Sequence, residues 1–498
     1  MTVNANVTPR APADLCQTGI EGFDDIVNGG LPRNRMYLVL GEPGVGKTTL
    51  ALQFLLAGAA KGEKGLYITL SETKAELNEV AASHGWDLTA ISLFELAAME
   101  AQIRSDAETT FFSPSEIELN RTTRVLLDQV EAINPSRVVF DSLSEVRLMS
   151  ETALRYRRQI LHLKQFFAGK KCTVLMLDDN SSSGEVDDQV ESLAHGVVLL
   201  TKTSPDFGVS RRQLMVKKIR SVRFREGYHD LLMVTGGLVV FPRLVAAEHH
   251  VPFPAETVPS GIAGLDRLLG GGIDRGTSTI FMGPAGTGKS TLTMRFALSA
   301  AERGEHVLFF TFDETTRTLL SRSRQLGFSL EPHLESGRIK VQQIDPAEIS
   351  PGELAYHIKQ AVQSDGARMI VIDSLNGFLH AMPDQRHLIL QLHELLSFLN
   401  QQGVASLMVL TQQGIVGTMQ SPLDLTYLAD TVVLLRYFEA AGAVRQVVSV
   451  IKKRSGNHER TIRELKMTGG GIEVGEPLQG FHGILTGVPV MKKGGEEL

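Results

Sequence analysis

Two stretches of this 498-residue chain have the residue types and spacing of a phosphate-binding loop. Residues 41–49 read GEPGVGKTT and residues 283–291 read GPAGTGKST, so both match G-x-x-x-x-G-K-[ST]. The glycines let backbone N–H groups close around phosphate oxygens at a helix N-terminus, the lysine neutralises phosphate charge and the hydroxyl holds Mg²⁺. The residues expected to bind nucleotide are Gly41, Gly44, Gly46, Lys47, Thr48 and Thr49, and then Gly283, Gly286, Gly288, Lys289, Ser290 and Thr291.

An aspartate ends a later apolar run in each half of the chain. Asp141 ends VVFD and Asp373 ends MIVID. A buried parallel strand would deliver such a carboxylate to the edge of the sheet beside the phosphates. Its expected role, together with Thr48 or Ser290, is to hold Mg²⁺ directly or through water. The alternative role is to cap the Ser-Leu turn that follows.

Further acids follow the strand that comes after each loop. Glu72 follows GLYITLS, and Asp313 and Glu314 follow VLFFTF. A carboxylate in this place can accept the proton of an attacking water or hydroxyl, which would make these residues catalytic. The alternative is an acid that merely starts a helix, where the helix dipole favours it. Only Ser71 accompanies Glu72, so we expect the two sites to be unequal.

A basic pair recurs late in each half. Lys218 and Arg220 lie in VKKIR, and Lys452 and Arg454 lie in IKKR. Strand alternation would point both members of a pair to one face. If neighbouring subunits form a ring, such a pair can reach the phosphate of the next subunit and act catalytically there. The alternative is a solvated charged face.

These landmarks recur in the same order at a nearly fixed distance. The offset is 242 at the loop lysines (289 − 47), 232 at the aspartates (373 − 141) and 234 at the arginines (454 − 220). We therefore expect two copies of one domain, at residues 1–247 and 248–498. A proline-rich stretch at 245–258 is expected to be the linker, with His249 and His250 as solvated residues rather than metal ligands.

Apolar runs alternate with helical stretches in both halves. Runs such as MYLVL, GLYITL and RVVFD are interrupted by amphipathic segments, and the second half repeats this with TSTIFM, HVLFFTF and RMIVID. This pattern predicts an α/β fold with a mostly parallel central sheet in each domain. Strand-rich segments late in each half, such as GVVLLTK with RRQLMVKKIR, predict an antiparallel extension at one edge.

Composition excludes several classes of protein. Hydrophobic residues make up 43% of the chain and charged residues 21%, which is typical of globular domains. The net charge of −6 is carried by scattered residues, which makes nucleic-acid binding a weak hypothesis. Two cysteines cannot build a disulfide framework, and neither a leader peptide nor an apolar run of membrane-spanning length is found. We expect a cytoplasmic protein that does not bind membranes.

With these motifs in place, the chain resembles the KaiC-like double-domain ATPases of the RecA superfamily over about residues 14–488. The resemblance includes the entry motif [TS]-G-I-x-G-x-D at 18–24 and 260–266, both loops, the acids, the aspartates and both basic pairs. It implies ATP and Mg²⁺ as cofactors, bound between subunits of a homo-hexamer with two stacked rings. It also implies slow hydrolysis in the N-terminal ring, reversible autophosphorylation in the C-terminal ring, and KaiB-like or other signalling partners.

The chain departs from the family pattern at three places. Ser71 stands where the family commonly has a first glutamate, which puts N-terminal hydrolysis in question. The acceptor pair falls on Thr426 and Tyr427, so one acceptor is a phenol. The tail after LTGVPV is only MKKGGEEL, which argues against dependence on an activator that engages a longer tail.

Three functions remain open from the sequence. The first is an ATP-hydrolysing serine/threonine autokinase in circadian or related signalling. The second is a non-kinase switch, in which nucleotide only sets the assembly state. The third is a RecA-like DNA motor, which needs basic loops, whereas GIVGTMQSPLD at 414–424 carries only an acidic charge.

Overall fold

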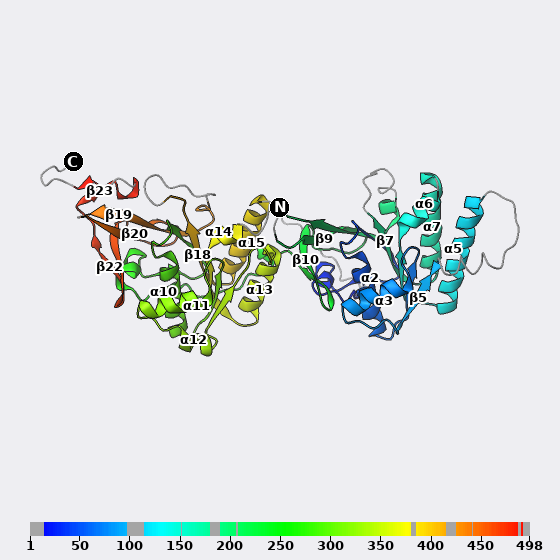
Figure 1. Cartoon of the computed structure of the whole chain (residues 1–498), viewed down its shortest axis with the longest axis horizontal. Helices are drawn as coiled ribbons and strands as arrows, with labels where there is room; N and C mark the ends of the chain where they lie inside the picture. Colours follow the sequence, from blue (N-terminus) through cyan, green and yellow to red (C-terminus); the bar gives the residue numbers. More distant parts are fainter. Residues whose placement is uncertain are drawn as a thin grey trace, which may run out of the picture. The chain divides into compact units, whose positions relative to one another are not determined.

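The computed structural model describes residues 14–96, 114–150, 152–179, 190–205, 208–379, 385–414, 425–440, 442–486 and 490–491. The chain divides into two compact units, Met1–Arg243 and Leu244–Leu498, which are coloured blue to green and green to red in Figure 1. The loop at 415–424 and the tail from 492, on which two expectations depend, lie outside the described residues.

A nine-stranded sheet forms the centre of the first unit, in the order β11-β10-β9-β8-β3-β7-β6-β4-β5. The parallel strands are β3 (Met36–Gly41), β4 (Gly65–Thr69), β5 (Ile91–Glu95), β6 (Arg137–Asp141), β7 (Thr173–Asp179) and β8 (Gly196–Thr203). The antiparallel extension adds β9 (Arg211–Ile219), β10 (Tyr228–Val234) and β11 (Gly237–Phe241). The helices are α1 (Phe23–Ile26), α2 (Lys47–Ala59), α3 (Lys74–Ser83), α5 (Pro114–Ile133), α6 (Leu143–Met149) and α7 (Ala153–Gly169).

The second unit repeats this topology in the order β16-β15-β17-β18-β14-β19-β20-β21-β22. Its strands are β14 (Ser278–Gly283), β15 (His306–Thr311), β16 (Ile339–Gln343), β17 (Ala367–Asp373), β18 (Ala405–Thr411), β19 (Thr431–Ala440), β20 (Ala443–Lys453), β21 (Arg463–Thr468) and β22 (Gly471–Pro477). Its helices are α9 (Ala263–Leu268), α10 (Lys289–Glu302), α11 (Thr316–Gln325), α12 (Glu331–Glu335), α13 (Pro351–Gln363), α14 (Leu375–Leu379) and α15 (Gln385–Gln401). Short two-stranded ribbons are β1 (Leu15–Cys16) with β2 (Leu31–Pro32), β12 (Thr257–Val258) with β13 (Ile273–Asp274), and β23 (Phe481–His482) with β24 (Val490–Met491). The predicted α/β class, with a mostly parallel sheet and an antiparallel edge in each half, is confirmed.

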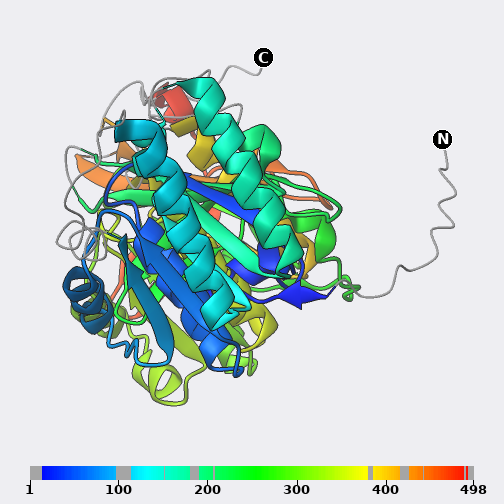
Figure 2. The ribbon, with the colours of Figure 1, turned by 90° about the vertical axis from the view of Figure 1, so that its right-hand side faces the viewer.

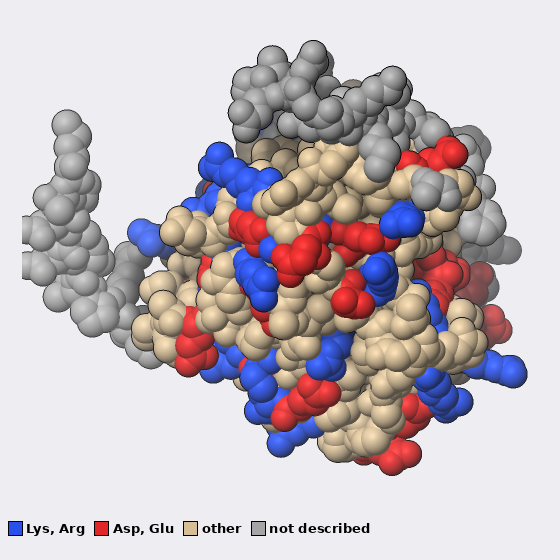
Figure 3. Space-filling model, turned by 90° about the vertical axis from the view of Figure 1, so that its left-hand side faces the viewer, with Lys and Arg blue, Asp and Glu red and all other residues tan. Residues whose placement is uncertain are grey.

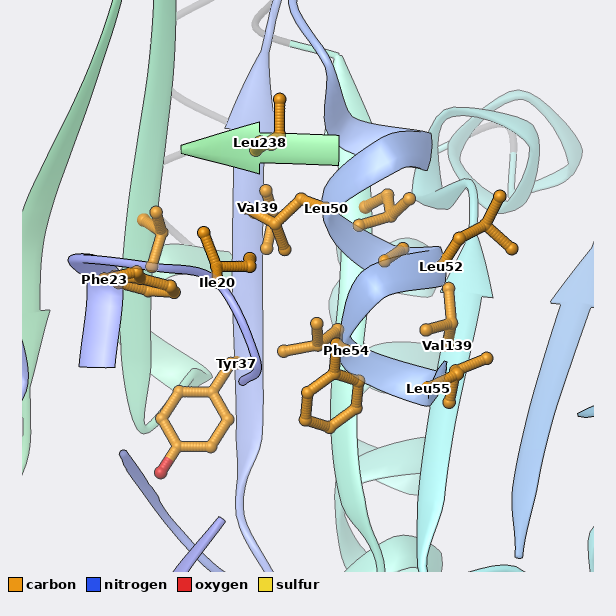
Figure 4. Close-up of a cluster of buried hydrophobic side chains, with 14 of the residues drawn as sticks. Ile20, Phe23, Tyr37, Val39, Leu50, Leu52, Phe54, Leu55, Val139 and Leu238 are labelled. Atoms are coloured by element: carbon orange, nitrogen blue, oxygen red, sulfur yellow. The ribbon is translucent and has the colours of Figure 1, made fainter. Parts of the chain in front are cut away.

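Each sheet is covered on both faces, because successive strand residues point to opposite sides. In β3, Tyr37 and Val39 belong to one buried cluster, which α2 covers, whereas Leu38 and Leu40 belong to the other, which α5, α6 and α7 cover. Figure 4 shows the first cluster, with Leu50 of α2 beside Val39 of β3. On the other face α5 and α7 lie side by side (Figure 2), and Gln159 of α7 donates to Thr123 of α5.

The boundary between the units differs from the expected one. It falls at Arg243, four residues before the expected end at 247, because Leu244 and Ala246 are buried in the core of the second unit. Residues 246–248 form a 3₁₀ helix whose Ala246 N–H donates to Glu394 of α15 (3.1 Å). His249 packs edge-on against Phe398, so it is not a solvated linker residue, while His250 is exposed. Much of the expected linker is therefore part of the second domain.

The surface and the helices agree with a globular chain of mixed charge. On the face shown in Figure 3, basic and acidic side chains of the described residues are interspersed. Among the described helices, none has the length and apolar character needed to cross a membrane.

Candidate nucleotide-binding sites

Both glycine-rich loops connect a central strand to a long helix, as the motif predicts. The first joins β3 to α2 and the second joins β14 to α10. Gly46 and Gly288 precede the helices with φ of 115° and 97°, a left-handed conformation that glycine adopts without strain. Because glycine has no side chain that could cap the helix, the first amide N–H groups stay available for an anion.

The lysine of the first loop has a carboxylate partner. Lys47 Nζ donates to the carbonyl oxygens of Gly41 (2.7 Å) and Glu42 (3.2 Å) and to Asp179 Oδ1 (2.8 Å). Asp179 ends β7, the strand directly beside β3, and it pairs in register with Gly41. Sequence reasoning did not find Asp179, although it follows an apolar run in the same way as Asp141.

The lysine of the second loop lies in a different environment. Lys289 is buried and its Nζ donates to the carbonyl oxygen of Pro284 (2.6 Å). Burial lowers its pKa to about 8, while the nearby Asp373 carboxylate opposes that shift. Gly283 pairs in register with Thr411, so a neutral residue occupies the place that Asp179 has in the first unit.

A hairpin of the antiparallel extension supports the second loop. Tyr437 Oη donates to Ala285 O (3.2 Å) and Gln446 Nε2 donates to Gly286 O (3.1 Å). A Cβ at Gly286 would lie 2.6 Å from Tyr437 Oη, so only glycine fits there. Side chains of β19 and β20 thus hold the backbone of the loop in place.

Asp141 ends β6 and Asp373 ends β17, which are equivalent parallel strands of the two sheets, so each carboxylate lies at the carboxyl edge from which the loop also starts. Asp141 Oδ2 accepts a hydrogen bond from Tyr67 Oη (2.5 Å), and Asp373 accepts one from the Ser290 hydroxyl. Burial raises the pKa of both carboxyls, that of Asp373 to about 6. A hydroxyl and a buried carboxylate side by side fit Mg²⁺, which takes one or two protein carboxylates and completes its shell with phosphate and water.

The acid of the first unit presents a free oxygen. Glu72 is held by Thr69, which donates to its carbonyl oxygen (2.7 Å) and accepts from its N–H (2.9 Å). Its Oε2 is buried and makes no hydrogen bond to any described residue. Burial, and then the charge of Asp141, raises the pKa of Glu72 to about 7. The start of α3 is capped by Thr73 and Glu76, so capping that helix does not require Glu72.

The acids of the second unit are both engaged. Asp313 Oδ2 accepts from the Ser374 hydroxyl (2.7 Å), and Glu314 Oε2 forms an ion pair with Arg322 Nη2 of α11 (2.9 Å). Burial raises the pKa of Glu314, and Arg322 opposes that shift. The two sets of acids therefore differ in a further respect. Arg322, which sequence reasoning did not single out, pairs with Glu314.

The basic pairs lie near the amino ends of the parallel strands, at the opposite end from the phosphate loops. Lys218 donates to Glu191 O and Arg220 to Ser192 O (2.7 Å). Lys452 donates to the carbonyl oxygens of Thr426 and Ala429 (both 2.8 Å), and Arg454 to Tyr427 O (2.8 Å) and Asp430 Oδ1 (3.3 Å). The pair in the second unit therefore holds the turn that carries both candidate acceptors.

The position of that turn follows from Asp430. Its carboxylate accepts from the N–H of Ser278, the first residue of β14, whereas the phosphate loop follows Gly283 at the last residue. A six-residue strand is about 17 Å long from first to last residue. The turn and its basic pair therefore do not line the phosphate loop of their own unit.

The entry motif serves local structure. Asp24 accepts from the N–H (2.9 Å) and hydroxyl (2.8 Å) of Thr18, and Asp266 accepts equivalently from Ser260 (2.6 and 2.7 Å). These bonds fix the turn that leads into the first short helix of each unit.

Comparison with known proteins agrees with this geometry. The family described as "ATPase: KaiC" matches residues 16–245 and 258–479. The circadian clock oscillator protein KaiC of Parathermosynechococcus lividus is 27% identical, over 95% of this chain and 87% of that protein. The circadian clock protein KaiC3 of Synechocystis sp. is 26% identical over 95% and 94%, and KaiC of Synechococcus elongatus is 26% identical over 98% and 93%. Two repeats of the family, each with its own loop, lysine and strand-end aspartate, cover most of the sequence, and the chain belongs to the KaiC ATPase family.

Proposed function

We propose that this protein is an ATP-hydrolysing serine/threonine autokinase that works as a homo-hexamer of two stacked rings. ATP binds between adjacent subunits. The first unit hydrolyses ATP, and the second phosphorylates Thr426. The names of its relatives point to circadian or related signalling in the cytoplasm, with KaiB-like or other proteins as partners.

The observation that carries this proposal is the position of Thr426. The turn that bears it lies at the first residue of β14, whereas the phosphate loop of the same unit follows the last residue of that strand. An acceptor hydroxyl must lie within a few ångströms of the transferred phosphate. Thr426 therefore suits the loop of a neighbouring subunit, and a head-to-tail interface of this kind forms a ring when its rotation closes.

Bound ATP and Mg²⁺ supply the transferable phosphoryl group and the charge that neutralises it. In the second unit, Lys289 and the loop amides hold the phosphates, and Ser290 and Asp373 hold the metal. Glu314 or Asp313 accepts the proton of the Thr426 hydroxyl. Lys452 and Arg454 of the neighbouring subunit fix the acceptor turn and carry positive charge toward the shared site.

In our proposal, no side chain of the first unit is phosphorylated. Lys47 and Thr48 hold phosphate and metal together with Asp141. Glu72 takes the proton of the attacking water, because its unpartnered Oε2 is free to do so. Lys218 and Arg220 complete the site from the adjacent subunit.

Native mass spectrometry with ATP, followed by phosphosite mapping with γ-labelled ATP, tests the proposal. We expect a hexamer and label on Thr426 within the peptide 421–438. Hexamers without label in that peptide under any nucleotide condition would favour the non-kinase switch. A protein that stays monomeric when saturated with ATP would contradict the shared site.

A further inference from the structure

The two units differ in the surroundings of their acids, and Arg322 accounts for most of the difference. Glu72 and Glu314 occupy equivalent places after β4 and β15, and both are clamped by the preceding strand through Thr69 and Thr311. At the same offset of 242, Arg322 corresponds to residue 80 (322 − 242), which is Val80. The cation beside the acid is therefore present in the second unit and replaced by an apolar side chain in the first.

The geometry of α11 explains why Arg322 reaches Glu314. Arg322 lies in the last turn of α11, and long helical side chains lean toward the helix N-terminus, where Glu314 lies just before the cap residue Thr315. The guanidinium meets Glu314 Oε2 at 2.9 Å, with both side chains largely shielded from solvent. The pair is thus less screened than a surface ion pair.

We propose that Arg322 is a positioning residue that restrains Glu314 and so keeps ATP hydrolysis slow in the second site. A general base needs a carboxylate oxygen free to reach the proton it abstracts. The charge of Arg322 attracts Glu314 Oε2 at 2.9 Å, although Nη2 makes no hydrogen bond, whereas Glu72 Oε2 has no ion-pair partner among the described residues. ATP bound at the second site is thereby lost to water more slowly.

This inference rests on the proposed function only in taking Glu314 to act at bound ATP. A different role for Arg322 predicts a different result. Its Nε and Nη2 are both buried without a hydrogen-bond partner among the described residues, so the side chain also has two donors that a phosphate oxygen could use. If Arg322 binds phosphate, its loss weakens ATP binding; if it restrains Glu314, its loss speeds hydrolysis.

The experiment measures steady-state ATP hydrolysis by the full chain carrying Glu72→Gln, which removes the acid of the first site. Into this parent we place Arg322→Val, which copies the first unit, and Arg322→Gln, which keeps a polar side chain if the valine variant folds poorly. Arg322→Lys keeps the charge. Arg324→Val is the matched control, since Arg324 lies on the same helix but pairs with Glu331 at the surface.

We expect Arg322→Val and Arg322→Gln to raise kcat about three- to tenfold with KM for ATP unchanged, a small part of what general base catalysis supplies. Arg322→Lys and Arg324→Val should resemble the parent. An unchanged kcat in both neutral variants, or a lower kcat with a raised KM, overturns the inference. Absence of label at 421–438 in a chain that still hydrolyses ATP contradicts the autokinase instead, so the two failures are distinguishable.

Discussion

The lysines of the two phosphate loops show how far two copies of one backbone can diverge. Lys47 forms an ion pair with Asp179, whereas Lys289 is buried and donates to a backbone carbonyl, and Thr411 stands at the strand position equivalent to Asp179. The acids diverge in the opposite sense, because Glu72 Oε2 has no hydrogen-bond partner among the described residues, whereas Glu314 Oε2 forms an ion pair with Arg322. The order of the strands is equivalent in both units. These differences lie in side chains at strand ends and on helix α11, where a substitution changes the charge around the site.

The largest effect should come from the second lysine. We expect Lys289→Ala to reduce label at Thr426 to background, a loss of more than about 10³-fold, because the phosphates lose their main cationic ligand. Hydrolysis at the first site should persist. Phosphorimaging and phosphate release measured on the same sample check this. Equal loss of both activities would show that the two sites do not work separately.

Removing Arg454 should lower phosphorylation nearly as much, and the site affected should be that of the neighbouring subunit. We expect Arg454→Ala to lower phosphorylation about 10³-fold, as for other arginines that complete a neighbour's site. Lys340→Ala, which removes an exposed ion pair with Asp365 on an edge strand, is the control and should have no effect.

Rings assembled from two different variants give a stricter test of the shared site. Rings assembled from equal amounts of the Arg454→Ala and Lys289→Ala chains should recover activity at about a quarter of their interfaces, if assembly is random. The label should appear on the Lys289→Ala chain, which supplies the intact Arg454 and Thr426. No recovery on mixing, in rings shown to be mixed by mass, would rule out the shared site.

The pH dependence of the first site should follow Glu72. Its pKa is raised to about 7 by burial, so the ionised form that accepts a proton is depleted below that pH. In a Lys289→Ala background, which silences the second site, hydrolysis should fall about tenfold for each pH unit below 7. Glu72→Gln should give a low rate without this limb. A rate that stays constant between about pH 6 and 8 would refute the role of Glu72 as base.

The smallest effect should come from Asp179. It competes with phosphate for Lys47, so Asp179→Thr should tighten ATP binding at the first site about two- to fivefold, the value of a partly exposed ion pair. Titration with a fluorescent ATP analogue in the Lys289→Ala background measures this. The reciprocal Thr411→Asp, tested with Lys47→Ala, should weaken the second site. Weaker binding by Asp179→Thr would mean that Asp179 itself helps to hold the nucleotide or its metal.

Much of the fold was predictable from local pattern. The period of apolar residues identified the strands that carry Asp141 and Asp373, and the glycine spacing identified the loops that start α2 and α10. The two compact units divide four residues before the expected boundary at 247, because prolines indicate where regular structure stops but not which core the flanking residues join. Leu244 and Ala246 join the second core through contacts with residues more than a hundred positions away.

The sequence by itself determined that there are two glycine-rich loops between a strand and a helix and which acids follow them, because backbone conformation at a strand–glycine–helix junction depends on neighbours in the chain. Only the tertiary structure decided that Lys47 meets Asp179, that Glu314 meets Arg322, and that Arg454 holds the turn of Thr426. These are contacts between charged side chains brought together by strand order and helix packing. Their strength depends on burial and distance, and neither quantity is encoded in spacing along the chain.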